Sequence, residues 1–358
     1  MKKITLLIAF LLPAIFCFAQ IDSLDIKIGQ MIMVGMSGKT AKKNSAIIKD
    51  IKKGIVGGVL LFEYNINPTN SQENLLELTN DLQEAAQIPL LISIDQEGGQ
   101  VNRLKMKYGF PSMPSAQIVG QKNDSAYTHK IGNTIASSLQ TCGINLNFAP
   151  DVDILNPNCP VLGKRNRCYS SNVKTIVQCA EIMIEEHKRL NIKTALKHFP
   201  GHGSSTSDSH LGLVDVSKTW NVEELFPYKY LIDTGSVDMI MTAHIINKKL
   251  DKSGLPATLS KKIVTGLLRK QLHYNGVVIS DDMQMHAISK FYGLEQSLKL
   301  SINAGVDIVI FSNNIEGSKD YTPENIHATF KKLVLEREIP MSRINESYTR
   351  IMNLKKSK

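Results

Sequence analysis

One short stretch of the chain gathers several side chains that bind metals or transfer protons. KHFPGHGSSTSDSHLG, residues 197–212, contains three histidines, a lysine and an aspartate around a Pro-Gly turn. Asp208 precedes His210 by two residues, so its carboxylate can hydrogen-bond one ring nitrogen, fix the tautomer and leave the other nitrogen to deliver a proton. The stretch therefore predicts an acid/base pair on a loop.

The same stretch could instead bind a metal ion, because histidine and aspartate are common zinc ligands. The Pro-Gly turn separates His198 from His202, so their four-residue spacing cannot form one face of a helix. The sequence has neither an H-E-x-x-H motif nor an H-x-H-x-D run. We therefore expect no metal. A surface loop with incidental histidines is a further alternative, which the position of the stretch after an apolar run argues against.

Two other segments end an apolar run in a carboxylate. IDQEGGQVNRL (94–104) contains Asp95 and turns through two glycines that bring Arg103 back, so the pair could hold sugar hydroxyls or form a structural ion pair. GVVISDDMQM (276–285) contains Asp281 and Asp282. Asp281 could be the nucleophile of a retaining glycosidase, whereas the two carboxylates together could bind a cation and Asp282 could cap a helix.

Short apolar runs recur along the chain and indicate the strands that position these candidate site residues. Eight runs read as buried parallel strands: 30–36, 54–62, 89–95, 144–150, 193–199, 238–244, 276–282 and 307–313. Helical patterns lie between them at 71–86, 172–190 and 260–272, with Ser71, Asn172 and Ser260 as expected caps. The alternation predicts an α/β fold, a single-domain (β/α)8 TIM-type barrel, and a doubly wound open sheet is the alternative.

Barrel enzymes carry their chemistry at the carboxyl ends of the strands and in the loops that follow. In this sequence Asp95, Lys197-His198, His244 and Asp281 close four of the predicted strands. We therefore expect these side chains to meet at one end of the barrel.

The first 20 residues have the features of an export signal. Lys2 and Lys3 precede an apolar run from Ile4 to Phe16, and a small-x-small pattern ends at Ala19. We expect cleavage there, leaving a mature domain over 20–358 without a membrane span. Removing two lysines lowers the net charge from +9 to +7. This diffuse excess suits an anionic cell-wall glycan or a solvated surface, and nothing in it points to nucleic acid.

Four cysteines remain after residue 19. In an exported protein Cys159 and Cys168 could form a disulfide across a ten-residue loop, and free thiols are an equal alternative. No spacing among the four matches a zinc site.

Together these motifs resemble the single-barrel β-N-acetylhexosaminidases of glycoside hydrolase family 3. The resemblance runs from about Leu24 to Leu354 and includes, in the family's order, IDQEGGQVNRL, NFAPDVDI, RCYSSN, KHFPGHG with a downstream DSH, MTAH and ISDDMQM. It implies Asp281 as nucleophile and His210, held by Asp208, as acid/base. It also implies that no metal or organic cofactor takes part.

The resemblance further assigns a set of residues to the N-acetylglucosamine ring. These are Asp95, Arg103, Arg167, Lys197 and His198. The arginine segment departs from the family pattern because GKRNRCYSSN has two extra residues, so Arg165 stays an alternative to Arg167. A second departure is Phe62-Glu63-Tyr64-Asn65, where many members have Phe-x-Arg-Asn.

The resemblance implies a retaining enzyme that removes terminal β-linked N-acetylglucosamine from carbohydrate substrates, with peptidoglycan fragments as the expected source. With the export signal, it places a monomeric enzyme in the periplasm. A family 3 β-glucosidase, a phosphorylase that transfers the sugar to phosphate, and a non-catalytic muropeptide-binding protein remain the alternatives. The retained Asp281 and Asp208/His210 pair argue against the last of these.

Overall fold

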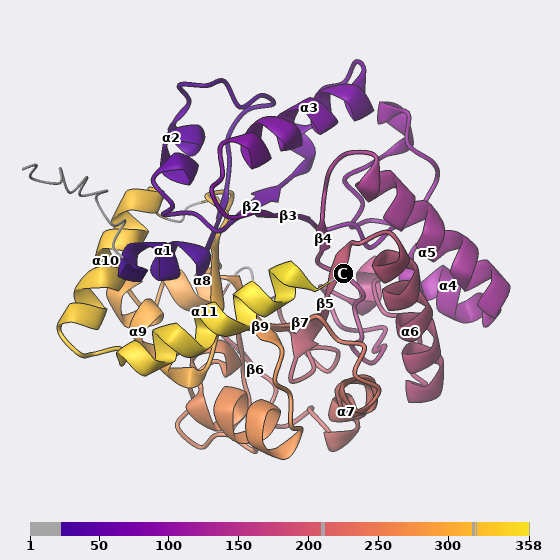
Figure 1. Ribbon diagram of the computed structural model, residues 1–358. Coiled ribbons are helices and arrows are strands. Elements are labelled where there is room, and N and C mark those ends of the chain that lie inside the picture. Colours follow the sequence, from indigo (N-terminus) through magenta and orange to yellow (C-terminus); the bar gives the residue numbers. More distant parts are fainter. Residues whose placement is uncertain (1–22, 209–211, 317–318, 320, 358) are drawn as a thin grey trace, which may run out of the picture.

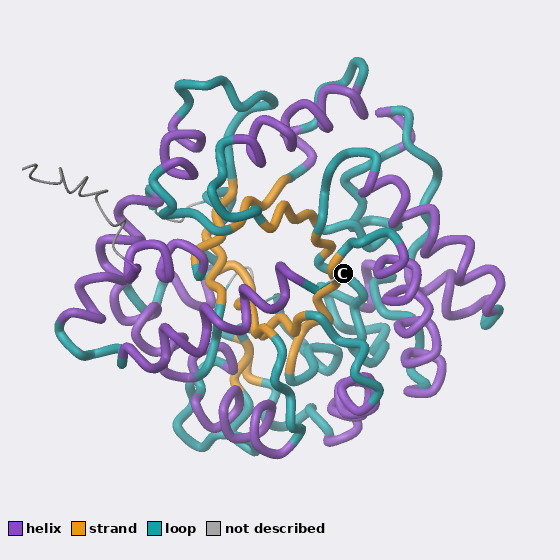
Figure 2. The backbone as a smooth tube through the Cα atoms, in the orientation of Figure 1, coloured by secondary structure: helices purple, strands orange, loops and turns teal. Residues whose placement is uncertain are grey.

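The chain forms a closed barrel of parallel strands with helices around it, shown in Figures 1 and 2. The computed structural model describes residues 23–208, 212–316, 319 and 321–357. The expected signal peptide, 1–19, and the expected acid/base His210 lie outside the described residues. Within them, no helix is both long enough and apolar enough to cross a bilayer.

All eight apolar runs contain a barrel strand, so the predicted barrel is confirmed and the open sheet is excluded. The strands are β1 (Ile32–Gly35), β2 (Gly58–Leu61), β3 (Leu91–Ile94), β4 (Leu146–Asn147), β5 (Lys193–Phe199), β7 (Met239–Thr242), β9 (Val277–Asp282) and β10 (Ile308–Phe311). They close in the order β1-β10-β9-β7-β5-β4-β3-β2. β4 is shorter than the run that predicted it, and Pro150, which lacks an N–H for the ladder, lies just beyond. A separate pair, β6 (Val214–Asp215) and β8 (Ile245–Ile246), lies outside the barrel.

Helices surround the barrel, and two of the three predicted helical ranges, 71–86 and 172–190, contain the α-helices α3 and α6. The α-helices are α1 (Ser23–Gln30), α2 (Ala46–Lys52), α3 (Ser71–Glu84), α4 (Ala116–Lys122), α5 (Ser125–Gln140), α6 (Val173–Arg189), α7 (Phe226–Asp233), α8 (His286–Ser289), α9 (Leu294–Ala304), α10 (Pro323–Leu335) and α11 (Met341–Lys356). The third predicted helix is the π-helical η6 (Lys262–Gln271).

Two of the three expected caps are confirmed. Asn172 accepts a hydrogen bond from the N–H of Lys174 at 2.9 Å, and the Ser260 hydroxyl accepts from the N–H of Ile263 at 3.1 Å. The third is wrong, because Asn70 takes the capping position before α3 and Ser71 belongs to the helix, where its hydroxyl donates to the carbonyl of Asn67. The Ser71 hydroxyl therefore bonds to the loop before α3, and the sequence pattern of a helix start does not distinguish this bond from a cap.

The strands are buried on both faces, between the barrel interior and the surrounding helices. β2, β3, β7 and β10 are buried at every position. Each fully buried aliphatic side chain of this kind contributes about 1.5–3 kcal/mol. This explains why the sequence shows continuous apolar runs instead of alternation.

One end of the barrel is closed by the C-terminal helix, which crosses it in Figure 1. The Nζ of Lys355 on α11 donates to Oε1 of Gln30 at 2.6 Å and to the carbonyl of Gly57 at 2.9 Å, both just before barrel strands begin. Burial lowers the pKa of Lys355 to about 7. The amino ends of the strands are therefore covered, and the carboxyl ends remain for a site.

Candidate active site

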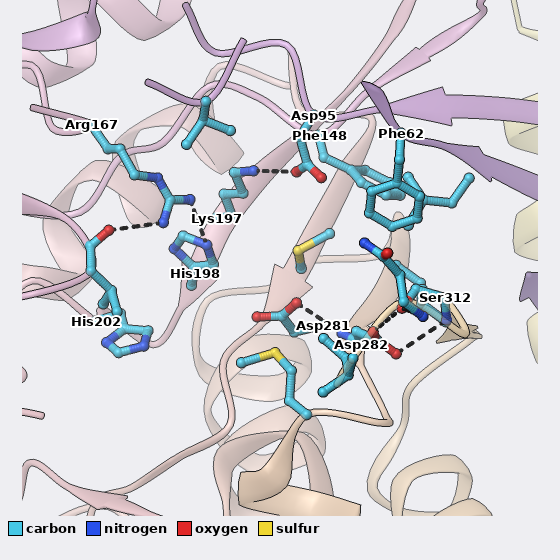
Figure 3. Close-up of a pocket in the computed structure, with 18 of the residues that line it drawn as sticks. Phe62, Asp95, Phe148, Arg167, Lys197, His198, His202, Asp281, Asp282 and Ser312 are labelled. Carbon is cyan, nitrogen blue, oxygen red and sulfur yellow. Dashed lines mark hydrogen bonds and ion pairs between the residues drawn. The ribbon is translucent and has the colours of Figure 1, made fainter. Parts of the chain in front are cut away.

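A pocket of about 320 Å³ lies at the carboxyl ends of the barrel strands (Figure 3). Six of the residues predicted from the sequence line it: Asp95, Arg103, Arg167, Lys197, His198 and Asp281. These positions are separated by up to 186 residues in sequence, from 95 to 281, and the closed barrel brings them together.

Lys197 stands at the centre of the charged wall. From β5, its Nζ donates to Oδ1 of Asp95 at 2.9 Å and lies 2.7 Å from Oε1 of Glu97. Its side chain is 2% exposed. Burial alone would lower the pKa of Lys197, but the two carboxylates raise it above its usual value. The group is therefore a fixed cation at the floor of the pocket.

Glu97 connects Lys197 to Arg167, and sequence reasoning did not find it. Nε of Arg167 donates to Oε2 of Glu97 at 2.9 Å and Nη2 donates to Oε1 at 2.8 Å, a paired geometry that fixes the guanidinium plane. Although burial opposes ionisation, Arg167 and Lys197 hold the pKa of Glu97 well below its usual range. Glu97 follows Asp95 by two residues, and this spacing was the one signal that could have pointed to it.

The two other arginines near the pocket are more exposed. Nη2 of Arg103 lies 3.7 Å from Oδ2 of Asp95, with side chains 26% and 21% exposed, so both can also reach a ligand. The N–H of Arg103 is fixed by Oε1 of Gln96 at 2.9 Å. Arg165 also lines the pocket but is exposed, whereas Arg167 is held by Glu97.

His198 is oriented from below by Asp153. Oδ2 of Asp153 lies 2.7 Å from Nδ1 of His198 and also accepts from its backbone N–H at 3.2 Å. Oδ1 of the same carboxylate accepts from the N–H of His202 at 2.7 Å. Nη2 of Arg167 lies 3.3 Å from Nε2 of His198. One buried carboxylate thus sets the ring of His198 and the start of the following loop.

Asp151, Asp153 and His198 are close enough to be considered as a metal site. One ligand atom from each lies within 4.8 Å of the others. However, Asp153 and His198 already hydrogen-bond each other, and Nη2 of Arg167 lies 3.8 Å from Oδ2 of Asp151. A divalent cation would have to displace that bond and lie beside a guanidinium. Burial, and to a smaller extent the neighbouring Asp153, raise the pKa of Asp151 well above its usual value. This shift favours the neutral, protonated form of Asp151.

Asp281 is the next-to-last residue of β9 and points into the pocket in Figure 3, across from Lys197 and His198. Its Oδ1 accepts from the N–H of Asp282 at 2.8 Å. Asp282 has a different setting: it is buried, Ser312 hydrogen-bonds its carboxylate, and burial raises its pKa to about 6 despite those bonds. The two adjacent aspartates are therefore chemically distinct.

The other strand-end histidine lies behind this pair. Nε2 of His244 is 3.0 Å from the carbonyl oxygen of Asp282, and Nδ1 is 2.8 Å from the hydroxyl of Thr258. His244 is buried and supports the end of β9.

The loop after β5 starts from a firmly held stem. Nδ1 of His202 lies 2.5 Å from the hydroxyl of Ser205, and Nε1 of Trp220 donates to the carbonyl of Pro200 at 3.0 Å. Burial, and to a smaller extent the neighbouring His198, lower the pKa of His202 to about 4. Asp208 is half-buried further along the loop and does not line the pocket. His210 follows outside the described residues.

The loop that carries Arg167 rests on a small apolar cluster. Cys159 and Cys168 pack there with Val161 and Leu162, and both cysteines are buried free thiols in the structure. Sγ of Cys159 faces the carbonyl of His202 at 3.8 Å.

A closed parallel barrel with charged side chains converging at the carboxyl ends of its strands defines a (β/α)8-barrel enzyme. The model of the glycosyl hydrolase family 3 N-terminal domain matches residues 23–354, and the chain belongs to that family.

Two curated relatives are each about a third identical to this chain over the aligned residues. "Beta-hexosaminidase A" of Pseudoalteromonas piscicida is 34% identical over 322 residues, covering 84% of this chain and 53% of the relative. "Beta-hexosaminidase" of Tolumonas auensis is 34% identical over 268 residues, covering 74% and 77%. The chain thus spans about half the length of the first relative.

Solved structures agree with the fold. A family 3 β-N-acetylglucosaminidase from a Paenibacillus species superposes with a TM-score of 0.84 at 34% identity, covering 93% of this chain and 62% of the other. A β-N-acetylhexosaminidase from Beutenbergia cavernae gives a TM-score of 0.82 at 26% identity, covering 94% and 99%.

Proposed function

We propose that the protein is a retaining β-N-acetylhexosaminidase that removes terminal β-linked N-acetylglucosamine. The observation that carries this proposal is the position of Asp281, which faces Asp95, Lys197, His198 and Arg167 across one pocket. Those four side chains offer hydrogen-bond donors and acceptors for several hydroxyls of one sugar ring. A carboxylate opposite them is suitably placed to reach the anomeric carbon.

The reaction proceeds in two displacements. Asp281 attacks the anomeric carbon while His210 protonates the departing oxygen, which breaks the glycosidic bond and leaves a glycosyl ester on Asp281. His210 then takes a proton from water, which attacks the same carbon and releases the sugar with its configuration retained. Asp208 orients the histidine. This chemistry uses only side chains of the chain.

The network below the pocket supports the first displacement. Glu97 and Asp153 are anionic, so Arg167 and His198 are held in one geometry before the sugar arrives. Such preorganisation means that little ordering is required when the ring binds.

We further propose peptidoglycan fragments as the substrate and the periplasm as the compartment, with the enzyme acting as a monomer. The basic net charge, +9 for the whole chain, suits an anionic glycan, and the first 19 residues read as an export signal.

The test is turnover of 4-nitrophenyl β-N-acetylglucosaminide, with the product followed by proton NMR. We expect the β-anomer first, with a rate independent of phosphate. A phosphate-dependent rate with sugar 1-phosphate as product would make the protein a phosphorylase. Faster turnover of the matching glucoside would make it a β-glucosidase, and binding without turnover would make it a muropeptide-binding protein.

A further inference from the structure

The first residues of the loop after β5, which we call the stem (residues 200–205), are held by the segment that leads into α7. Nε1 of Trp220 donates to the carbonyl of Pro200 at 3.0 Å. Glu224 follows four residues later in the 3-10 helix η4 (Val222–Leu225) and is only 4% exposed. The proposed acid/base pair lies further along the same loop, so whatever fixes the stem also affects the position of that pair.

Glu224 contacts the stem where two backbone segments approach closely. Gly201 has a φ of +108°, and a Cβ at this position would lie 2.5 Å from Cβ and 2.7 Å from Oε2 of Glu224. Two residues further, a Cβ at Gly203 would lie 2.1 Å from the carbonyl oxygen of Ile154. The stem therefore packs directly on Glu224 and on the loop after β4.

The surroundings of the Glu224 carboxyl group disfavour a negative charge. In the described part of the chain, its Oε2 is buried and has no hydrogen-bond partner. The titratable groups that face Glu224 there are Asp153 and Tyr228. Although burial opposes ionisation, His198 lowers the pKa of Asp153, whereas burial raises the pKa of Tyr228 well above its usual value. An ionised Glu224 would thus face an anion and a neutral phenol.

Ionisation of Glu224 therefore works against the packed stem. Burial raises the pKa of Glu224 to about 7; the polar groups of Ser204 oppose this rise, and Asp153 adds to it. A buried carboxylate without a donor is costly, and water relieves that cost. Because Gly201 packs against Oε2, water reaches this atom when the stem moves away.

We propose that Glu224 is a positioning residue for the acid/base pair: its protonated form keeps the stem in place, and its ionisation releases the stem. This inference rests on the proposed function, in which Asp208 and His210 transfer the proton. Glu224 is not among the residues that line the pocket, so it acts through the loop and not on the sugar.

The chain contains one tryptophan, Trp220, whose fluorescence reports on the stem. Its indole is 5% exposed and bonds to the carbonyl of Pro200. For the wild type we expect weak quenching by acrylamide at pH 5.5. Quenching should increase at least about twofold by pH 8.5, because local opening exposes the indole. The midpoint should lie near pH 7, where Glu224 ionises.

Glu224→Gln keeps the size of the side chain and cannot ionise, so its quenching should stay weak from pH 5.5 to pH 8.5. Glu224→Met, which also cannot ionise, replaces it if the glutamine variant does not fold. Asp50→Asn is the matched control: burial raises the pKa of Asp50 to about 7 as well, but α2 lies across the barrel from α7 in Figure 1. It should keep the wild-type transition. A flat wild-type profile, or the same transition without an ionisable residue 224, would overturn the proposal.

Kinetics separate positioning from a purely structural role. The measurement is the ratio of kcat/KM for Glu224→Gln over the wild type with N,N′-diacetylchitobiose, whose departing sugar requires a proton. We expect a ratio of about 1 at pH 5.5 and about 10 at pH 8, because about a tenth of a group stays protonated one pH unit above its pKa. His210 titrates in both proteins and cancels. A ratio that does not change with pH would overturn the positioning role.

Failure of the proposed function would look different. In that case the wild type would not cleave N,N′-diacetylchitobiose at any pH. The fluorescence of Trp220 would still test the stem: a transition near pH 7 that Glu224→Gln abolishes would support its control by Glu224, and identical profiles would overturn it.

Discussion

Nζ of Lys197 lies 2.7 Å from Oε1 of Glu97, and the two side chains are only 2% and 3% exposed. The same carboxylate holds Arg167 through paired hydrogen bonds. One buried anion thus compensates two buried cations at the floor of the pocket. Such a network is costly to break, because removing Glu97 leaves Arg167 without its paired carboxylate and leaves Lys197 with Asp95 as its remaining ion-pair partner.

Glu97→Gln is therefore expected to destabilise the fold by about 3 kcal/mol, as for other buried ion pairs that lose one partner. Urea denaturation followed by circular dichroism measures this loss. Glu295→Gln is the matched control, because Glu295 pairs with Lys332 on the surface, where both side chains are half exposed. It should change stability by less than about 1 kcal/mol. Similar losses for both variants would contradict the role of Glu97.

The barrel strands could be predicted from the sequence, whereas Glu97 could not. All eight strands follow from apolar runs, because a strand buried on both faces must be apolar along its length. Asp95, Lys197 and Asp281 follow from their positions at strand ends. These predictions depend on local pattern and on the geometry of a barrel.

The partners of those residues depend on tertiary contacts. Asp153 binds His198 and the N–H of His202, from 45 and 49 positions away. Glu97 binds Arg167 from 70 positions away. Many carboxylates in the chain have equally plausible local settings, so the sequence alone could not select these two.

Glu224 supplies a prediction on pH. Burial raises its pKa to about 7 from 4.5. Because the folded state then binds a proton more tightly than the unfolded state, this contribution is complete below about pH 4.5 and is lost as the pH rises through 7. We expect the wild type to lose more stability than Glu224→Gln between pH 5 and pH 8. The difference should be about 2–3 kcal/mol.

Urea titrations of both proteins at the two pH values measure this difference. Asp50 and Asp282, whose pKa values are raised to about 7 and 6, are present in both proteins and cancel. Parallel pH profiles for the wild type and Glu224→Gln would exclude a neutral Glu224.

For Lys355 we expect folding stability to change with pH in the opposite direction, rising as the pH rises. Its pKa is lowered to about 7 from 10.5 by burial, so the unfolded state binds more protons between these values and stability rises with pH across that range. In Lys355→Met this rise should be much smaller. Thermal unfolding from pH 7 to pH 10 measures it, with Lys356→Met, an exposed neighbour on α11, as the control. The same slope in both variants would show that Lys355 is charged in the fold.

Asp281→Asn tests the nucleophile. The amide keeps the size of the side chain and a hydrogen-bond acceptor for the N–H of Asp282, so we expect a normal circular dichroism spectrum and turnover of the aryl glycoside at the background level. Asp233→Asn, at the exposed end of α7, should retain full activity. Substantial turnover by Asp281→Asn would reject the assignment.

His210→Ala tests the proton donor through the leaving group. A 2,4-dinitrophenolate departs without a proton, whereas a sugar alkoxide requires one, so removal of a general acid should cost little in the first displacement with the dinitrophenyl glycoside and about 10²- to 10⁴-fold with a disaccharide. Loss of the same group as base slows the second step, so the ester on Asp281 should accumulate and give a burst of dinitrophenolate.

Asp208→Asn should show the same pattern in weaker form, because the histidine remains but loses its charged partner. Equal losses for both leaving groups, without a burst, would mean that His210 acts only in binding.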